Sequence, residues 1–430
     1  MNPPRDDRLA PVRVLVPYIR TFYGGVRRVL EAGLPGLARD PRLVLTYAEL
    51  CRNDADMDAL ERSGVGVDRR LGVPGRSVLS GRRGRLAGIA REAPRLAHIA
   101  WNVGRHLDEH DVCWVHGHRE LLLVLAARAG RSIPIVWHWH GPPLSLSTEG
   151  EGAPAERRFT QLLARRCARV VAVSLFCAEQ AVRLGVPADR LVLVENAVRL
   201  EDAPPREHPP LPPRVDGQVT LLVPCASIRA HKGVHVAVQA LRHLSPRHVL
   251  WITGDRDDPV AAGYVAELRA LAARDGAAGR VHFLGARGDV HRVMAEADVV
   301  VVPSIWREPF GLVAAEAQLV GTPLVVADRG ALPEIADGGR AGLVVRAEDP
   351  AALAAAVGRL DEDRVLRAGL VDVARRRAAE RYGYERWRGQ IAALLAEVAG
   401  RVAPARVLRP AEVSPARPPL RREAGLRGIR

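Results

Sequence analysis

The stretch DVVVVPSIWREPFGLVAAEAQLVGTPLVVA, residues 298–327, contains the pattern that decides the fold. Two short runs of aliphatic residues, 298–303 and 323–327, flank a segment of small and apolar residues long enough for a helix. Continuous aliphatic runs are typical of parallel strands buried on both faces, and parallel strands need a crossover between them. The stretch therefore predicts a strand–helix–strand unit of a parallel sheet, with its helix starting near Gly311.

The same unit recurs on both sides of a proline-rich segment, and helical patterns alternate with the apolar runs. The runs before that segment are 12–17, 43–47, 112–116, 133–138, 170–174 and 191–196; those after it are 219–224, 248–253, 281–285, 298–303, 323–327 and 341–345. Two such series predict an α/β protein with two doubly wound, Rossmann-like parallel-sheet domains. In these sheets ligands bind at the carboxyl ends of the strands.

The proline pattern sets the expected domain boundaries. We expect an N-terminal domain over 1–199, a Pro-rich linker over 200–218 and a C-terminal domain over 219–383. A helix over 384–400 is expected to cross back to the first domain. The tail, 401–430, is basic and rich in proline and arginine, and we expect it to be disordered.

The charge of the 430-residue chain is strongly positive, +14, and much of it lies in the tail. Eight arginines against two glutamates give residues 401–430 a charge of +6. We attribute the rest to composition and solvated surface, and expect no nucleic-acid partner. The tail is suited to a weak peripheral contact with an anionic membrane.

The sequence favours a cytoplasmic protein, with peripheral location at the inner face of the membrane as an open alternative. The polar start, MNPPRDDRLAP, has no apolar core of a signal peptide, and no run approaches the length of a membrane span. The five cysteines form no CxxC pair, which is typical of reduced, structural thiols.

Two glutamates flank the expected start of the helix in the opening stretch. Residues 311 to 313 offer free backbone N–H groups at a positive helix end, which suits a phosphate. Glu308 lies just before that end, and Glu316 lies ~7–8 Å along the helix axis. Carboxylates repel phosphate but accept hydrogen bonds from hydroxyls, so a sugar and a ribose on either side of a diphosphate fit. Glutamates at this spacing also occur as plain loop and helix charges stabilised by the dipole.

The surrounding residues resemble the signature of the family 4 retaining glycosyltransferases of the GT-B fold. That signature reads E-x-F-G-x-x-x-x-E, then G-x-P-V-V, then a glycine and a glutamate, and the resemblance covers roughly residues 12 to 400. It implies that Glu308 contacts hydroxyls of the transferred sugar and Glu316 contacts the ribose. The backbone of Gly311, Leu312 and Val313 would meet the sugar phosphate.

Two further segments resemble the family's donor site. ASIRAHKG, residues 226–233, resembles the element G-R-L-x-x-x-K-G, whose arginine and lysine bind the diphosphate. Lys232 matches, whereas Ser227 replaces the arginine; Arg229 is the candidate to substitute for it. A solvated turn before a helix is the alternative.

The glycine pair Gly24 and Gly25 resembles the family's N-terminal loop, which approaches the diphosphate and the acceptor. A plain turn is the alternative for this pair. The loop from Gly285 to Arg287 would approach the nucleobase.

Four histidines end two strands of the first domain, and the spacing places His116 with His118 and His138 with His140 on shared strand faces. A metal site is the less favoured interpretation, because no carboxylate or thiol partner is placed beside them. By resemblance, His140 lies near the sugar phosphate; a hydrogen-bonded strand-end histidine is the alternative. Asp54, Asp56 and Asp58 have the spacing of a metal-binding DxD motif, but we interpret them as a helix N-terminus.

The resemblance implies a retaining glycosyltransferase that moves a sugar from a nucleoside-diphosphate sugar to an acceptor hydroxyl. UDP is the favoured nucleotide and GDP the second. The catalytic candidates are Glu308, Lys232 and His140; Arg287 and the residues named above would bind the donor, and no metal or cofactor is expected. The N-terminal domain would bind the acceptor: a small natural product, a lipid-linked saccharide or a polysaccharide. The alternatives are a non-catalytic nucleotide-sugar-binding subunit of the same fold and a metal-dependent hydrolase.

Overall fold

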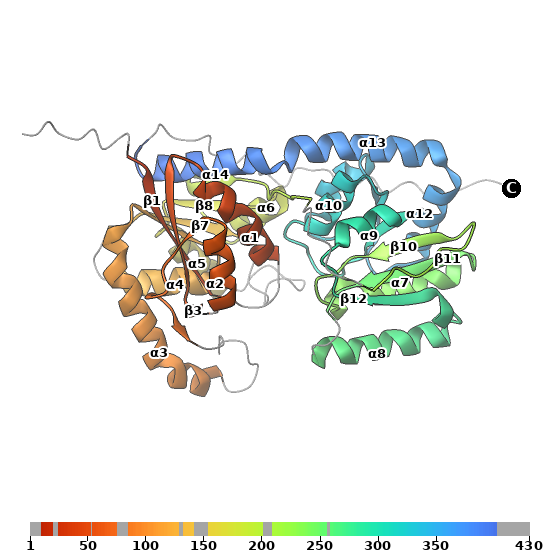
Figure 1. Ribbon diagram of the computed structural model, residues 1–430, viewed down its shortest axis with the longest axis horizontal. Coiled ribbons are helices and arrows are strands. Elements are labelled where there is room, and N and C mark those ends of the chain that lie inside the picture. The colour runs from red at the N-terminus through yellow and green to blue at the C-terminus, as the bar shows by residue number, and fades with distance from the viewer. Residues whose placement is uncertain are drawn as a thin grey trace, which may run out of the picture.

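The computed structural model describes residues 10–19, 25–52, 54–74, 85–128, 132–141, 154–200, 209–255 and 259–401. Within them, two parallel sheets lie side by side, each flanked by helices (Figure 1). Gly24, most of the expected linker (201–208) and the tail beyond Arg401 lie outside the described residues.

The N-terminal sheet has seven strands in the order β4-β2-β1-β6-β7-β8-β9, and every pair of neighbours is parallel. The strands are β1 (Val12–Tyr18), β2 (Leu43–Glu49), β4 (Gly66–Val67), β6 (Val112–Val115), β7 (Ile135–Trp139), β8 (Arg169–Ala172) and β9 (Leu191–Leu193). The helices are α1 (Gly25–Ala38), α2 (Asp54–Arg62), α3 (Arg85–His106), α4 (His118–Ala127), α5 (Pro154–Ala164) and α6 (Leu175–Arg183). A small separate pair joins β3 (Cys51–Arg52) to β5 (Val73–Pro74).

The C-terminal sheet has six parallel strands in the order β12-β11-β10-β13-β14-β15. The strands are β10 (Val219–Val223), β11 (His248–Thr253), β12 (Val281–Gly285), β13 (Val299–Val302), β14 (Leu324–Ala327) and β15 (Leu343–Val345). The helices are α7 (Val234–Ala240), α8 (Pro259–Arg274), α9 (Val290–Glu296), α10 (Leu312–Val320), α11 (Leu332–Ile335), α12 (Pro350–Glu362) and α13 (Arg364–Arg381).

Both sheets follow the same doubly wound topology. In each, the first strand is central, the next two lie on one side, and the later strands lie on the other. The strand order therefore reverses between β1 and β6 in one sheet and between β10 and β13 in the other. Loops that leave the carboxyl ends of these strands border the crevice where such sheets bind ligands.

The predicted α/β class is confirmed, and all twelve apolar runs form strands. The valines of β13 show why, since all four are at most 5% exposed and so are covered on both faces. Three additional strands, β3, β4 and β5, have two residues each. A two-residue strand leaves no periodic pattern in the sequence, so these strands were not predicted.

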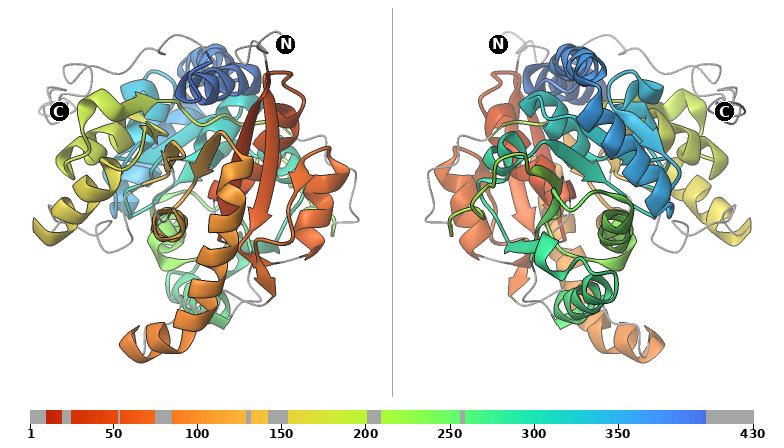
Figure 2. Two further views of the ribbon diagram at one scale, coloured as in Figure 1. Left: turned by 90° about the vertical axis from the view of Figure 1, so that its left-hand side faces the viewer. Right: turned by 90° about the vertical axis from the view of Figure 1, so that its right-hand side faces the viewer.

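Helix α14 (Tyr384–Val398) continues from α13 and packs on the N-terminal sheet, so the end of the described chain spans both halves (Figures 1 and 2). Trp387 is buried among residues of β1, β6 and α1. Gly33 makes this packing possible, because a Cβ there would lie 2.6 Å from the indole ring. The Tyr384 hydroxyl donates to the carbonyl of Gly33 at 2.7 Å, and Arg169 pairs with Glu397 at 2.5 Å.

None of the helices that the structure describes is both long and apolar enough to cross a membrane.

Candidate active site

Lys232 is brought to the carboxyl end of β13 by a tight turn after β10. The turn is a short 3-10 helix, Ala230–Lys232, followed by Gly233 in the left-handed region, with φ of 69°. A side chain at Gly233 would collide with the carbonyl of Pro303, so the turn can pack there only with glycine. Lys232 is also the only lysine in the sequence, and the other basic residues are arginines and histidines.

Glu308 lies in the loop after β13 and receives two hydrogen bonds on one oxygen. Lys232 Nζ donates to Glu308 Oε1 at 2.7 Å, and Ser304 Oγ donates to the same oxygen at 2.6 Å. The loop is held by Ala331, whose N–H donates to the Glu308 carbonyl at 2.8 Å. Gly330, with φ of 61°, lies against this backbone so closely that any side chain would collide with it.

The Lys232–Glu308 pair stays charged although it is largely shielded from water. Burial raises the pKa of Glu308, but the Lys232 ammonium outweighs burial, and the pKa lies below its ordinary value. Burial likewise lowers the pKa of Lys232, but the Glu308 carboxylate outweighs it, and that pKa lies above its ordinary value. The pair therefore offers a fixed positive and a fixed negative group side by side at neutral pH.

Helix α10 begins as the sequence predicts, with Gly311 at its N-cap and φ of 99°. Its first N–H groups follow directly after the loop of Glu308, and they form a positive helix end. Glu316 lies inside the helix and is 3% exposed. Its Oε1 lies 3.0 Å from Arg28 Nη2, while its Oε2 is buried and has no hydrogen-bond partner in the structure.

The N-terminal domain contacts the same loop from the opposite side. A Cβ at Gly25, the first residue of α1, would lie 3.2 Å from the Leu312 side chain, and a Cβ at Gly141 would lie 2.8 Å from Pro309. Ser174 Oγ donates to the Pro309 carbonyl at 2.6 Å. The loop that carries Glu308 is therefore part of the interface between the two domains.

Three imidazoles cluster behind Gly141, at the ends of β6 and β7. His116 Nδ1 lies 3.0 Å from His140 Nε2, and the rings of His138 and His140 stack with centroids 4.5 Å apart. Burial lowers the pKa of all three, that of His140 to about 3, so they are neutral at pH 7. Each imidazole offers one nitrogen that could bind a metal ion, and these three nitrogens lie within 4.8 Å of one another.

The expected pairing of His116 with His118 on one strand face is wrong. Strand β6 ends at Val115, and His118 is the first residue of α4. The chain therefore turns between the two histidines, and His118 packs edge-on against Trp137.

The three aspartates of the DxD pattern stand at a helix start, as expected. Helix α2 begins at Asp54; Asp56 pairs with Arg27, and Asp58 pairs with Arg69.

Arg229 was expected to bind the diphosphate, and Arg287 was expected to lie near the nucleobase. Arg229 precedes the turn of Lys232, and Ser227, at the family's arginine position, has a buried hydroxyl with no hydrogen-bond partner. The Arg287 guanidinium pairs with Asp289 at 2.8 Å and donates to the Pro209 carbonyl at 2.6 Å. The Arg287 side chain is thus held by the linker, and its backbone is the part left for a base contact.

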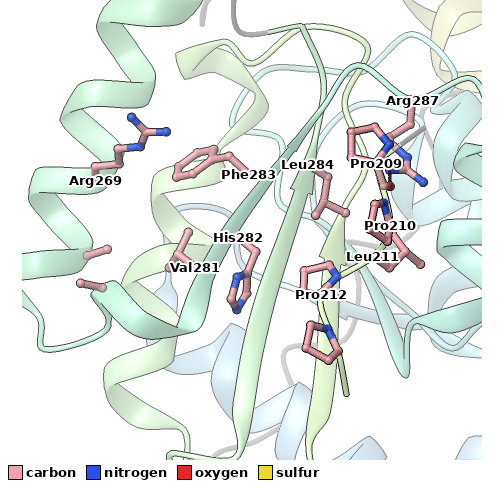
Figure 3. Close-up of a pocket in the computed structure, with 13 residues that line it drawn as sticks. Pro209, Pro210, Leu211, Pro212, Arg269, Val281, His282, Phe283, Leu284 and Arg287 are labelled. Carbon is pink, nitrogen blue, oxygen red and sulfur yellow. Dashed lines mark hydrogen bonds between the residues drawn. The ribbon is translucent and has the colours of Figure 1, made fainter. Parts of the chain in front are cut away.

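Arg287 also borders a cavity of about 750 Å³ between the proline segment 209–213 and the edge strand β12 (Figure 3). Phe283 and Arg269 line its other side, with the guanidinium 5.3 Å from the ring centroid. Neither Lys232 nor the two glutamates of the donor signature line this cavity. Its walls are mostly apolar.

The contacts of three polar residues near the domain interface were not predicted from the sequence. Arg28 lies one helical turn after Gly25, and that spacing was the available signal. His291 Nε2 lies 3.9 Å from Glu316 Oε1, with no signal in the sequence. Glu334, the last glutamate of the signature, accepts from the N–H groups of Leu175 and Phe176 at 3.2 and 3.3 Å, and so joins the two domains.

Comparison with known proteins decides the family. The model described as Glycosyltransferase Family 4 matches residues 23–202, and the model described as Glycosyl transferases group 1 matches residues 220–363. The chain belongs to the family 4 glycosyltransferases. It is 37% identical over 223 residues to the D-inositol 3-phosphate glycosyltransferase of Xylanimonas cellulosilytica, an alignment that covers 48% of this chain and 52% of that protein. The chain spans between about a quarter and a half of the length of the curated relatives it matches.

Solved structures support the GT-B architecture of this glycosyltransferase. The crystal structure of Anabaena Alr3699/HepE in complex with UDP-glucose superposes with a TM-score of 0.72 at 21% identity, covering 90% of this chain and 100% of that one. WaaG, a glycosyltransferase involved in lipopolysaccharide biosynthesis, superposes with a TM-score of 0.60 at 18% identity, covering 89% and 99% of the two chains. At these identities the likeness establishes the fold alone.

Proposed function

We propose that this glycosyltransferase moves a glycosyl group from a nucleoside-diphosphate sugar to an acceptor hydroxyl with retention of configuration. UDP is the first nucleotide to test, and GDP is the second. One observation carries the proposal: the Lys232–Glu308 ion pair stands beside the N-terminal end of α10 and at the domain interface. The complex of Anabaena HepE with UDP-glucose, a protein of the same fold, supports a nucleotide-sugar donor.

Each part of this site suits a different part of such a donor. The Lys232 ammonium and the free N–H groups of Leu312 and Val313 suit the diphosphate, since both are positive. Glu308 and Glu316 are hydrogen-bond acceptors and suit hydroxyls of the sugar and of the ribose. Glu308 has an oxygen beyond the one that Lys232 and Ser304 occupy, so it can bind a sugar hydroxyl while it keeps the lysine in place.

The chemistry follows from where charge develops. Breaking the bond between the sugar and the diphosphate leaves negative charge on the phosphate and positive charge on the sugar ring. Lys232 and the N-terminal end of α10 stabilise the negative charge on the phosphate. Neither group has to move during the reaction, because the ion pair already fixes Lys232 and the helix fixes its own N–H groups. Retention follows if the acceptor attacks from the side of the leaving phosphate, which then takes the acceptor proton. His140, neutral at pH 7, is suited to a hydrogen bond with the sugar phosphate rather than to an ion pair.

The domains divide the two substrates in this proposal. The C-terminal domain, 219–383, holds the donor, and the N-terminal domain, 1–199, holds the acceptor next to Gly25 and Gly141. A small natural product, a lipid-linked saccharide and a polysaccharide all remain candidate acceptors. The name of the relatives from Xylanimonas and Corynebacterium adds a phosphorylated cyclitol to the hydroxyl acceptors worth testing.

A non-catalytic nucleotide-sugar-binding subunit is the second candidate, and Ser227 is the observation that favours it. A hydroxyl there cannot neutralise a leaving diphosphate as an arginine would. Arg229 would have to supply that charge for the protein to be an enzyme.

Two measurements test the proposal. Thermal denaturation with UDP, GDP, ADP and dTDP should show stabilisation by one of them, because a ligand at 100 times its dissociation constant adds about 2.7 kcal/mol. Slow hydrolysis of the matching nucleotide sugar without acceptor should then release nucleoside diphosphate. Binding without any turnover would favour the non-catalytic subunit, and no binding by any of the four would contradict the donor site.

A further inference from the structure

The ion pair between Arg28 and Glu316 joins the two domains at the candidate nucleotide site. Arg28 lies in the first turn of α1, in the N-terminal domain, and Glu316 lies in α10, in the C-terminal domain. Arg28 Nη2 lies 3.0 Å from Glu316 Oε1, and the two side chains are 40% and 4% exposed. The buried carboxylate thus takes its closest positive partner from the opposite domain.

The other carboxylate oxygen of Glu316 is left without a partner. Oε2 is buried and accepts no hydrogen bond in the structure, and His291 Nε2, 3.9 Å from Oε1, is unpartnered as well. An unsatisfied carboxylate oxygen is costly when buried, and a bound ligand or water that donates a hydrogen bond removes that cost. The arrangement divides the carboxylate: Arg28 holds one oxygen, and the second can accept from one ligand hydroxyl.

The backbone brings the two helices together at the same point. Helix α1 starts at Gly25, and a Cβ there would already press on Leu312, the first residue of α10. A side chain at position 25 would require the Leu312 side chain to move by a few tenths of an ångström, so the two helix starts are close to their limit of approach here. The close approach of these helix starts is therefore what lets Arg28 reach Glu316.

We propose that Arg28 is a positioning residue for the nucleotide, acting across the domain interface on Glu316. By holding Oε1 it directs Oε2 to a ribose hydroxyl. This inference rests on the proposed function, because it takes the ribose to be the ligand of Glu316. It predicts that nucleotide affinity depends on a residue of the domain that binds the other substrate.

The test is a double-mutant cycle with UDP as the probe. Calorimetry compares wild type, Arg28→Ala, Arg28→Lys, Glu316→Gln and the double variant Arg28→Ala/Glu316→Gln. Because Arg28 is 40% exposed, its removal should weaken UDP binding by about 3–10-fold rather than by the larger factor of a buried pair. Arg28→Lys should recover most of the loss, since an ammonium can still pair with Oε1. On the Glu316→Gln background, Arg28→Ala should add less than about twofold.

Arg39→Ala is the matched control, because it removes an exposed arginine just after the other end of α1. It should leave UDP affinity unchanged. The donor KM for hydrolysis of UDP-glucose should rise in Arg28→Ala by the same factor as the dissociation constant, with kcat nearly constant. A general loss of folding would lower kcat as well, and would not be rescued by lysine.

Two results overturn the inference while leaving the proposed function in place. Wild-type affinity in Arg28→Ala would show that the ion pair has no part in binding. An equal loss on both backgrounds would show that Arg28 acts on the ligand directly, for instance on the phosphates. Failure of the wild-type protein to bind any of UDP, GDP, ADP and dTDP would instead contradict the proposed donor site, and the inference with it.

Discussion

Replacing Lys232 with methionine should both destabilise the protein and lower its affinity for the nucleotide. The substitution keeps the length of the side chain but removes the positive partner of Glu308, whose side chain is 10% exposed and keeps the hydrogen bond from Ser304. Removing one member of a fully buried ion pair costs about 3–5 kcal/mol, and an exposed pair is worth about 0–1 kcal/mol. The Lys232 side chain is 31% exposed, so we expect about 2 kcal/mol, which lowers the melting temperature of such a domain by about 4–8 °C.

The double variant Lys232→Met/Glu308→Gln should be more stable than Lys232→Met alone, because it leaves no unpaired buried charge. Its UDP affinity should also exceed that of Lys232→Met, in which the Glu308 carboxylate repels the diphosphate. Lys232→Met itself should lose about 10–150-fold in UDP affinity, the effect of one lost hydrogen bond to a charged group. Calorimetry and thermal denaturation measure both effects. Wild-type UDP affinity in Lys232→Met, or equal stability of the single and double variants, would refute the reasoning.

The pH dependence of the same pair follows from the two shifts. The pKa of Glu308 is lowered, so its contribution to stability is complete above its ordinary pKa of 4.5 and is lost as the pH falls through the lowered value. The pKa of Lys232 is raised, so its contribution is complete below its ordinary pKa of 10.5 and is lost as the pH rises through the raised value. Because Lys232 is the only lysine, ¹⁵N-labelled lysine gives one Nζ signal that reports this pKa. A pKa at or below 10.5 would contradict the ion pair.

Three further predictions concern other parts of the molecule. Glu308→Gln should spare UDP affinity and lower turnover, whereas Glu316→Gln should weaken UDP itself by about 10–150-fold; equal losses in calorimetry would mean that the two glutamates do not divide sugar from ribose. Activity should survive EDTA, because Lys232 and the α10 end supply the positive charge; loss restored by Zn²⁺ and abolished by His138→Ala would instead assign a metal to the three imidazoles. Trp387→Ala should destabilise the N-terminal domain by about 3–5 kcal/mol, since it leaves a cavity above Gly33, and an unchanged urea midpoint would show that α14 adds little to that core.

Much of the fold could be predicted because its information is local. The four buried valines of β13 form a continuous apolar segment, which is typical of a strand covered on both faces, and the five other runs of the same series are short and largely apolar. The start of α10 at Gly311 was predicted for the same reason, since the residues that end the loop and begin the helix are adjacent in sequence. Glu308 and Lys232 were found because each stands in a short segment that resembles a motif of the family signature.

The parts that were not predicted depend on contacts between distant segments. Arg28 and Glu316 lie in different domains, and no spacing within either segment predicts that their side chains meet. His116 and His138 come together because β6 and β7 are neighbours, whereas alternation along one strand wrongly paired His116 with His118. The side chain of Arg287 faces the linker because Asp289 and the Pro209 carbonyl both attract its guanidinium.

The crossing of α14 also affects how the protein is made. The N-terminal sheet is complete at β9, but its core lacks Trp387 until about 190 further residues have been synthesised. At about 5–20 residues per second, this delay lasts about 10–40 s. During that time the surface of α1 around Gly33 and Gly36 lacks the cover of Trp387 and Tyr384. Chains that stop before α14 keep this surface exposed, so early termination should yield aggregation-prone fragments rather than a stable acceptor domain.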